Sequence, residues 1–378
     1  MGTTIGVLTY VHTQRSADLA RRLEVKQYIQ EAEDIIYGKE GATTGHFDPR
    51  DSDRLELANR KIEKALTLDP NNADAVLLMG TFTEFGGKLD EAIALYKRAI
   101  ELNPNEFRAY VNWGIALTHQ GAYEQSIEKY RRAIEIKPSD DNSYYNLAAS
   151  LLWLGRKTES IEAYEAAIER NPLRYDAYSH MATVLYEVGR KDEAMRALRR
   201  AIEINPHEEK SYEFLDSLLY DQQNLKEDEI VVRKRVELDP KNSSALLSLV
   251  RVLYKQGKAA EAYDSCMKVI ELDPTSGSGY FCAGTVLSSK GIWDGAEFEF
   301  RKAVTFDPAL VSAYEGLSVA LLMQHKLAEA DAIFAQVKQR SETAARKQSS
   351  HGENHPGQAS TEYTEFEQIY NGLKARMK

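Results

Sequence analysis

The sequence predicts an all-α fold in which antiparallel helix pairs stack into a linear array. Eight of the ten prolines recur every 34 residues, from Pro70 to Pro308, without an insertion. Within each unit, two apolar segments have the i, i+3, i+4, i+7 spacing of one helical face. Glycines fall at a fixed place between the two segments. A fixed period of this length is typical of a helical repeat array, whose units bury their apolar faces by stacking on their neighbours.

The unit that ends at Pro138 shows the pattern in full. Its apolar and small positions are Tyr110, Trp113, Gly114 and Leu117 in the first segment and Ser126, Tyr130 and Ala133 in the second. Small residues such as Gly114 and Ser126 allow the two helices to approach closely. We expect each first helix to end at a glycine with a left-handed backbone; these are Gly87, Gly121, Gly155, Gly189, Gly257 and Gly291. Asn-Pro or Asp-Pro then ends the second helix, because a residue before proline avoids the α region.

This pattern resembles the tetratricopeptide repeat (TPR) family, whose repeat combines these large, small and aromatic positions with a closing proline. Eight registers match over residues 73–340. The resemblance implies a right-handed superhelical solenoid of antiparallel helix pairs. It also implies a concave groove, lined by the first helices, that binds peptides or helices. It does not indicate which partner is bound.

Residues 1–72 depart from the repeat and are expected to form an N-terminal helical cap. Residues 53–68 have the apolar register of a second helix. A Gly/Thr-rich loop at 38–52 displaces the first helix to residues 16–37. We interpret the two helices as a ninth, degenerate repeat.

The C-terminal part contains two different segments. Residues 341–360 have no Val, Ile, Leu, Met, Phe, Tyr or Trp, which predicts a flexible linker. Residues 361–378 are expected to form an amphipathic helix with an apolar stripe of Tyr363, Phe366, Tyr370, Leu373 and Met377. Because so short a helix is marginal alone in water, we expect it to cap the last repeat. The alternative is that it occupies the groove.

The repeat at 209–240 breaks the pattern. Asp216, Asp228 and Arg235 stand where neighbouring repeats have small residues. Uncompensated charges at helix-packing positions would cost several kcal/mol. We therefore expect Arg235 to pair with one of the aspartates, or the helices to splay and open a lateral contact site. The alternative is a solvent-exposed, loose joint.

The composition excludes several classes of function. Lys and Arg number 48 against 58 Asp and Glu, a net charge of −10, so the chain lacks the basic surface that nucleic acid requires. No stretch approaches 18 apolar residues and no signal peptide is recognisable, which predicts a cytoplasmic protein without membrane insertion. Only Cys266 and Cys282 are present, which fits a reducing compartment, and Cys266 is expected to be a packed thiol.

No motif for catalysis, cofactor or metal binding is found. Phosphate-binding glycine loops, the Gly-x-Ser-x-Gly elbow and the His-Glu-x-x-His motif are absent. His351 and His355 are four residues apart, but Gly352 and Pro356 argue against the helix that would bring them together. The sequence therefore predicts a non-enzymatic protein with no cofactor and no metal.

The candidate binding residues lie on the face of the first helices that the repeat does not use for packing. They are Asn112, His119, Asn146, Trp153, His180, Phe214, Arg251 and Lys255. We expect the two asparagines to bond a partner's backbone. Trp153 and Phe214 would take apolar anchors, and Arg251 with Lys255 would meet acidic groups.

Two binding modes of the TPR family can be compared with these positions. The carboxylate clamp requires Lys, Asn and Arg on successive first helices, and Lys210 is followed four residues later by Phe214 instead of Arg. The asparagine ladder of O-GlcNAc-transferase-like arrays is represented by Asn112 and Asn146, whereas Leu78 interrupts the series. A carboxylate clamp is therefore not expected, and the asparagine ladder is represented by two residues only.

The sequence predicts a scaffold or adaptor that binds a protein partner, as an extended peptide or a helix, in its groove. One alternative is a structural subunit of a larger assembly, with self-association through the terminal repeats. A second alternative is the targeting arm of an enzyme on another chain.

Overall fold

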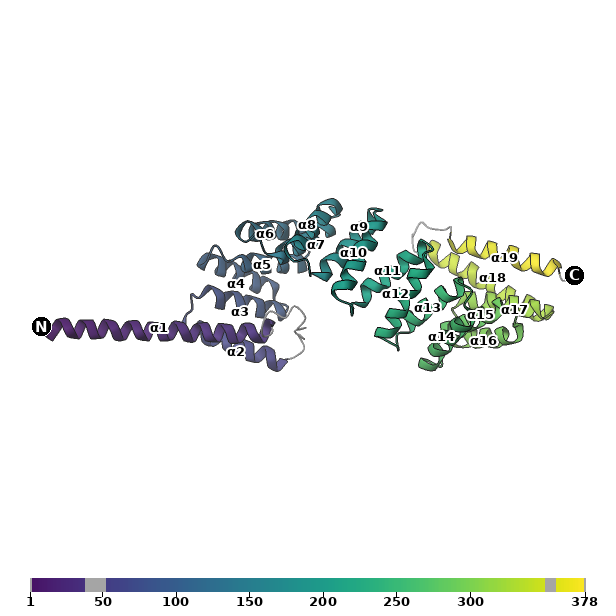
Figure 1. The fold of residues 1–378 in the computed structure, drawn as a ribbon, viewed down its shortest axis with the longest axis horizontal. Coiled ribbons are helices and arrows are strands. Elements are labelled where there is room, and N and C mark those ends of the chain that lie inside the picture. The colour runs from purple at the N-terminus through teal and green to yellow at the C-terminus, as the bar shows by residue number, and fades with distance from the viewer. Residues whose placement is uncertain (1, 38–51, 351–357, 377–378) are drawn as a thin grey trace. The chain divides into compact units, whose positions relative to one another are not determined.

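The structure, a computed structural model, describes residues 2–37, 52–350 and 358–376, and these ranges form helices joined by short turns, with no strand (Figure 1). The chain divides into two compact units, Met1–Ile204 and Asn205–Lys378. Consecutive helices pack against each other in pairs within each unit. The all-α fold of stacked helix pairs is therefore confirmed.

The N-terminal unit contains α1 (Gly2–Tyr37), α2 (Ser52–Leu68), α3 (Ala73–Phe85), α4 (Leu89–Leu102), α5 (Phe107–His119), α6 (Tyr123–Ile136), α7 (Asp141–Trp153), α8 (Lys157–Arg170), α9 (Tyr175–Glu187) and α10 (Lys191–Ile204). The C-terminal unit contains α11 (Glu209–Asp221), α12 (Leu225–Leu238), α13 (Ser243–Lys255), α14 (Ala259–Leu272), α15 (Gly277–Ser289), α16 (Trp293–Phe306), α17 (Val311–Met323), α18 (Leu327–Ser350) and α19 (Gln358–Arg376).

The helix ends follow the sequence signals. The side chain of Asn72 accepts a hydrogen bond from the Ala75 amide at 3.1 Å and so caps α3. Gly121 follows α5 with a φ of 76°, in the left-handed region, as the pattern predicts. Gln223 and His325 occupy the equivalent places in their repeats and have φ values of 58° and 61°. The turn is thus retained even where the glycine is missing.

The close approach expected at Gly114 is present. A Cβ atom added to this residue would lie 2.5 Å from Cε1 of Tyr130, which is inside van der Waals contact. Tyr130 is itself 1% exposed. The ring of α6 therefore packs directly on the backbone of α5, and a larger residue at position 114 would force the Tyr130 ring to move.

Helix α1 packs on α2 at the N-terminus of the array. Val25 and Ile29 of α1 are buried in one cluster with Ile62 of α2. The helix begins at Gly2, well before the residue 16 that the apolar pattern suggests. The loop expected at 38–52 lies outside the described residues, apart from Ser52, which begins α2.

A buried charge cluster links α11, α12 and α13 in the C-terminal unit. Arg235 is 2% exposed, and its Nη1 donates to Oδ2 of Asp216 at 2.8 Å. Arg251 donates from Nη2 to Oδ1 of the same aspartate at 2.7 Å. The expected pairing of Arg235 with an aspartate is therefore confirmed, and Asp216 is the partner.

The third member of this cluster, Asp228, is fully buried. No N–H donor in the described part of the chain bonds to its carboxylate oxygens, and its interacting neighbour is the carboxyl group of Asp216. Burial, followed by the charge of Asp216, raises the pKa of Asp228 to about 8, while Arg251 and Arg235 act in the opposite direction. Burial and the neighbouring carboxylate thus favour the protonated form of Asp228.

This raised pKa predicts a stability that falls with rising pH. The unfolded carboxyl titrates near pH 4, so between about pH 4 and pH 8 the folded state holds a proton that the unfolded state has released. We expect the free energy of unfolding of the C-terminal unit to be lower at about pH 8.5 than at about pH 6, by about 1–3 kcal/mol. Asp228→Asn should reduce this difference. Urea unfolding of both proteins at the two pH values measures it, and an equal pH dependence in both would contradict the assignment.

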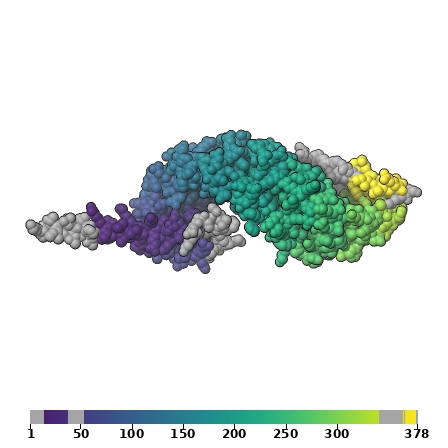
Figure 2. Space-filling view, in the orientation of Figure 1, coloured from purple at the N-terminus to yellow at the C-terminus, as the bar shows by residue number. Residues whose placement is uncertain are grey.

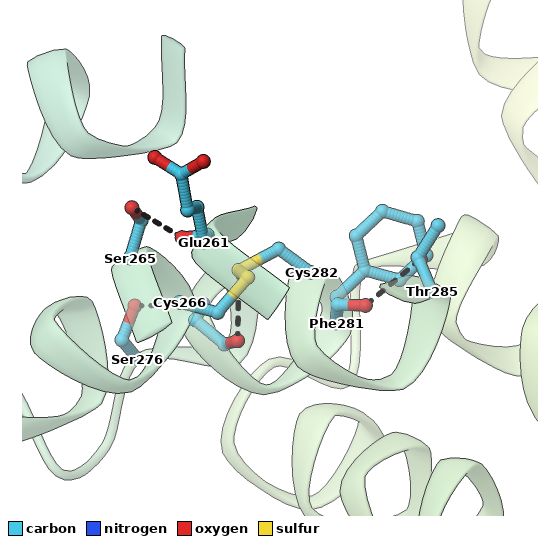
Figure 3. The surroundings of a disulfide bond; sticks show 8 residues. Glu261, Ser265, Cys266, Ser276, Phe281, Cys282 and Thr285 are labelled. Atoms are coloured by element: carbon cyan, nitrogen blue, oxygen red, sulfur yellow. Dashed lines mark hydrogen bonds between the residues drawn. A yellow bond between two sulfur atoms is a disulfide. The ribbon is translucent and has the colours of Figure 1, made fainter. Parts of the chain in front are cut away.

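The two cysteines form a disulfide between α14 and α15 (Figure 3). Cys266 is fully buried, as expected, but the prediction of a packed free thiol is wrong. Cys266 lies on the second helix of one repeat and Cys282 on the first helix of the next. In the structure Cys282 is 8% exposed, and the Cα atoms are 5.9 Å apart, within the usual range for a disulfide. Cysteine usage therefore no longer supports a reducing compartment.

Helix α18 is longer than the composition predicts. It continues to Ser350, so residues 341–350 are helical and the flexible linker expected at 341–360 differs from the structure there. Apolar residues are not needed to extend a helix that already exists, because propagation is far easier than nucleation. Alanine, arginine, lysine and glutamine, which dominate residues 344–348, are strong helix formers.

Helix α19 packs on α18 and α17 at the end of the array. Phe366 and Tyr370 are 8% and 1% exposed, and the Tyr370 ring stacks on Phe334 with centroids 4.3 Å apart. Residues 351–357 lie outside the described residues, as do Met377 and the side chain of Tyr363. Within the C-terminal unit, α19 therefore covers the exposed end of the last helix pair.

Candidate functional site

The first helices of the N-terminal unit line a cavity of 570 Å³, here called the N-terminal cavity. Helix α1 forms one wall, and α3, α5 and α7 form the rest. The lining residues are Gln30, Glu33, Asp34, Tyr37, Leu77, Leu78, Phe107, Arg108, Val111, Asn112, Ile115, Asp140, Asn142 and Asn146. Further toward its N-terminus, residues 14–24 of α1 are exposed, and Arg21 donates to the carbonyl oxygen of Leu68 at the end of α2. Figure 2 shows the described part of α1 in purple at the N-terminal end of this unit.

The floor of the N-terminal cavity is apolar. Leu78 and Val111 are 2% and 7% exposed, so they present a small apolar area while packing the core. Ile115 is half-buried beside them. A floor of this kind, surrounded by a few polar groups, is typical of binding sites in proteins.

Asn112 and Asn146 stand one repeat apart in the wall of the cavity. The Asn112 Nδ2 donates to Oγ1 of Thr81 at 3.0 Å, and the Asn146 Nδ2 donates to the carbonyl oxygen of Asn142 at 2.9 Å. Each amide group thus uses its nitrogen inside the protein. The carbonyl oxygens of both side chains remain as acceptors at the cavity.

Arg108 occupies the junction between α1, α3 and α5. Its Nη1 donates to Glu33 at 2.9 Å, its Nη2 to Asp74 at 2.8 Å and its Nε to Glu106 at 2.8 Å. These bonds connect α1 to the first two regular repeats. Every nitrogen of the guanidinium is engaged, so Arg108 orients the wall of the cavity and does not present a free positive charge.

The remaining candidate residues of this unit lie outside the cavity. Nδ1 of His119 is 3.3 Å from Glu84, whose pKa burial raises above its usual range. His180 forms a hydrogen bond of 2.8 Å with the Tyr145 hydroxyl. Trp153 is 69% exposed and stacks on Tyr123 with centroids 5.7 Å apart.

Phe214, Arg251 and Lys255 belong to the C-terminal unit. Phe214 is half-buried in α11, and Lys255 is exposed at the end of α13. Arg251 is bound to Asp216 and lies 3.8 Å above the ring of Tyr220. The charge of Arg251 is therefore partly satisfied within the chain, which the sequence did not indicate. Of the eight candidates, the structure brings only Asn112 and Asn146 into one described cavity.

Sequence reasoning missed the contribution of α1. Gln30, Glu33, Asp34 and Tyr37 line the cavity, yet they were not among the candidates. Residues 38–52 displace α1 from the 34-residue period. The groove positions of the regular repeats therefore cannot be transferred to α1 by subtracting 34. A repeat period alone therefore could not identify them.

The described residues contain no helix that is both long and apolar enough to cross a bilayer. They also contain no group of three or more His, Cys, Asp or Glu side chains placed to hold a metal ion.

Sequence models of one repeat family match much of the array. The model described as TPR repeat matches residues 86–121 and 114–155. Two models described as tetratricopeptide repeat match residues 145–209 and 243–276. No curated protein matches the chain significantly.

One of the similar solved structures, the first described here, shares this fold with a TM-score above 0.5. The C-terminal part of a TPR repeat-containing protein from Cytophaga hutchinsonii aligns with a TM-score of 0.55 at 16% identity, over 64% of this chain and 99% of that chain. A tetratricopeptide repeat protein from Parabacteroides merdae aligns with a TM-score of 0.42 at 17% identity, over 66% and 98%. YrrB, described as a TPR protein with an unusual peptide-binding site, aligns at 0.33 and 21% identity, over 58% and 95%. At these identities the likeness concerns the fold alone.

Proposed function

Because the chain is a tetratricopeptide repeat protein, we propose that it is a non-enzymatic scaffold or adaptor that binds a segment of a protein partner in the N-terminal cavity. The observation that carries this proposal is the combination of an apolar floor with two side-chain amide groups in one cavity of 570 Å³. The volume accommodates several side chains of a bound segment.

The two asparagines supply the main-chain recognition in this proposal. Asn112 and Asn146 each have a carbonyl oxygen available to a peptide N–H, and they stand on successive first helices. Bonds to the main chain hold a segment in an extended form and leave its side chains to decide specificity.

Two further contacts extend the proposal beyond the cavity. Trp153, 69% exposed and held flat against Tyr123, is suited to receive an apolar anchor of the partner. In the C-terminal unit, Lys255 is an exposed cation suited to an acidic group, with Phe214 as a second apolar contact. His119, His180 and Arg251 are proposed as weaker contacts, because each already has a partner in the chain.

The proposal predicts that Asn112→Ala with Asn146→Ala loses the partner. Two hydrogen bonds of about 0.5–1.5 kcal/mol each correspond to a loss of about tenfold in affinity. The measurement is affinity capture from the native cell extract by the wild type and the variant, with bound proteins quantified by mass spectrometry. The matched control is Glu101→Ala with Glu135→Ala, two exposed residues also one repeat apart, on second helices.

A protein retained by the wild type and the control but lost by the asparagine variant supports the scaffold. Proteins lost only in the control variant would instead favour a structural subunit that assembles through its outer face. If no captured protein distinguishes the three baits, the cavity is not the binding site.

A further inference from the structure

The charged groups around the N-terminal cavity are predominantly acidic. Arg108 is surrounded by Glu33, Asp74 and Glu106, which leaves this four-residue network with an excess of negative charge. All three carboxylates lie within 3 Å of the same guanidinium, so the cation is already neutralised. An anionic ligand would meet no available cation in this network.

Two further residues of the cavity lining carry negative charge. Asp34 and Asp140 line the cavity directly. Arg174 of the adjoining repeat donates to the lining residue Asn142 at 2.7 Å, and it is paired with Asp141 at 2.8 Å and Asp176 at 3.1 Å. Since Asp141 and Asp176 more than balance Arg174, the potential in the cavity remains negative.

The polar groups at the cavity also accept hydrogen bonds more than they donate them. The amide nitrogens of Asn112 and Asn146 are engaged within the protein, as is that of Gln30, which donates to Asp34 at 3.0 Å. The lining thus offers carboxylate and amide oxygens to a ligand above an apolar floor, together with the remaining N–H groups of the side-chain amides. A complementary ligand must supply donors and positive charge.

A lysine or arginine side chain meets both requirements and can also cover the apolar floor. Its aliphatic stem can lie along Val111 and Ile115 while its charged end reaches Asp34 or Asp140. The N–H groups of the same peptide can reach the oxygens of Asn112 and Asn146. The neighbouring cavity of 640 Å³, on the other side of Arg108, has Arg21, Arg22 and Lys26 in its wall as well as acids, so it lacks this excess.

We propose that the N-terminal cavity binds an extended peptide segment with a basic side chain between apolar ones. This rests on the proposed function and names the class of segment that is bound. The negative potential would also speed the encounter and make the binding weaken at high salt.

Selection of a random octapeptide library displayed on phage, with the full chain as bait, tests this proposal. We expect Lys and Arg to be enriched at least fivefold at one or more positions among the peptides retained by the wild type, with Asp and Glu depleted. In Asp34→Asn with Asp140→Asn, the enrichment should fall to less than twofold. Asparagine retains the shape of both side chains and the helix cap at Asp140.

The control is Glu101→Gln with Glu135→Gln, which changes the net charge equally on exposed second-helix positions. Basic enrichment that is retained in the control and lost in the aspartate variant supports the proposal. Retained peptides without basic enrichment, or basic enrichment unchanged in the aspartate variant, overturn it while leaving the scaffold function intact. If the wild type retains no more peptide-bearing phage than the variant Asn112→Ala with Asn146→Ala, the result contradicts the proposed function itself.

Discussion

Replacement of Arg235 by alanine is expected to lower the free energy of unfolding of the C-terminal unit by about 3–5 kcal/mol. The guanidinium is 2% exposed and bound to Asp216 at 2.8 Å. Its removal leaves Asp216 and Asp228 buried together with Arg251 as the only remaining cation of the cluster, and it opens a cavity. Both effects act against the folded state. Urea unfolding of the full chain, with hydrogen exchange of residues 209–255 to locate the transition, measures the loss.

The matched control replaces the whole cluster. Asp216→Ala, Asp228→Ala and Arg235→Ala together restore the small residues that stand at these positions in the preceding repeat, Ala182, Ala194 and Ala201. Because a complete apolar replacement removes the desolvation cost along with the pair, this triple variant should be more stable than Arg235→Ala alone. A triple variant less stable than the single one would show that the cluster contributes net stability, contrary to this account.

Deletion of residues 358–378, which removes α19, is expected to destabilise the last repeat by about 3–5 kcal/mol, the value of burying two aromatic side chains. Phe366 and Tyr370 lose their burial, and the Tyr370 hydroxyl no longer donates to Asp331 at 2.9 Å. The deletion exposes Phe334 and Val337 of α18. Thermal unfolding and size-exclusion chromatography should show a lower melting temperature and a tendency to associate.

Ile369→Ala provides the control for this deletion, since Ile369 is 58% exposed on the outer side of α19. It should change stability by less than about 0.5 kcal/mol. A deletion variant that melts and elutes like the wild type would show that α19 is not a cap. Peptide binding that becomes tighter in the deletion variant would instead favour the autoinhibitory role that the sequence left open.

Local and periodic features were predictable from the sequence because they depend on residues that are near in the chain. The helix pairs follow from the 34-residue spacing, and the turn at Gly121 follows from the positive φ that glycine allows. The close contact at Gly114 follows from the absence of a side chain on glycine. The pairing of Arg235 was also predictable, since a buried guanidinium requires a carboxylate and Asp216 and Asp228 occupy helix-packing positions of the same repeat.

Features that depend on contacts between repeats were decided by the tertiary structure alone. Because residues 38–52 displace α1 from the 34-residue period, the sequence does not show which α1 residues line the N-terminal cavity. Their position follows from the packing of α1 beside α3. Arg251 was expected to face a partner, but Asp216 lies within 2.7 Å across the helix interface and binds it. Cys266 and Cys282 occupy different positions in the repeat pattern and meet because α14 and α15 are adjacent. The sequence by itself thus determined the repeat and the helix boundaries inside the array, but not the start of α1 or the end of α18. Which side chains face a ligand was determined by the packing of one repeat on the next, because distances across that interface are not encoded in the period.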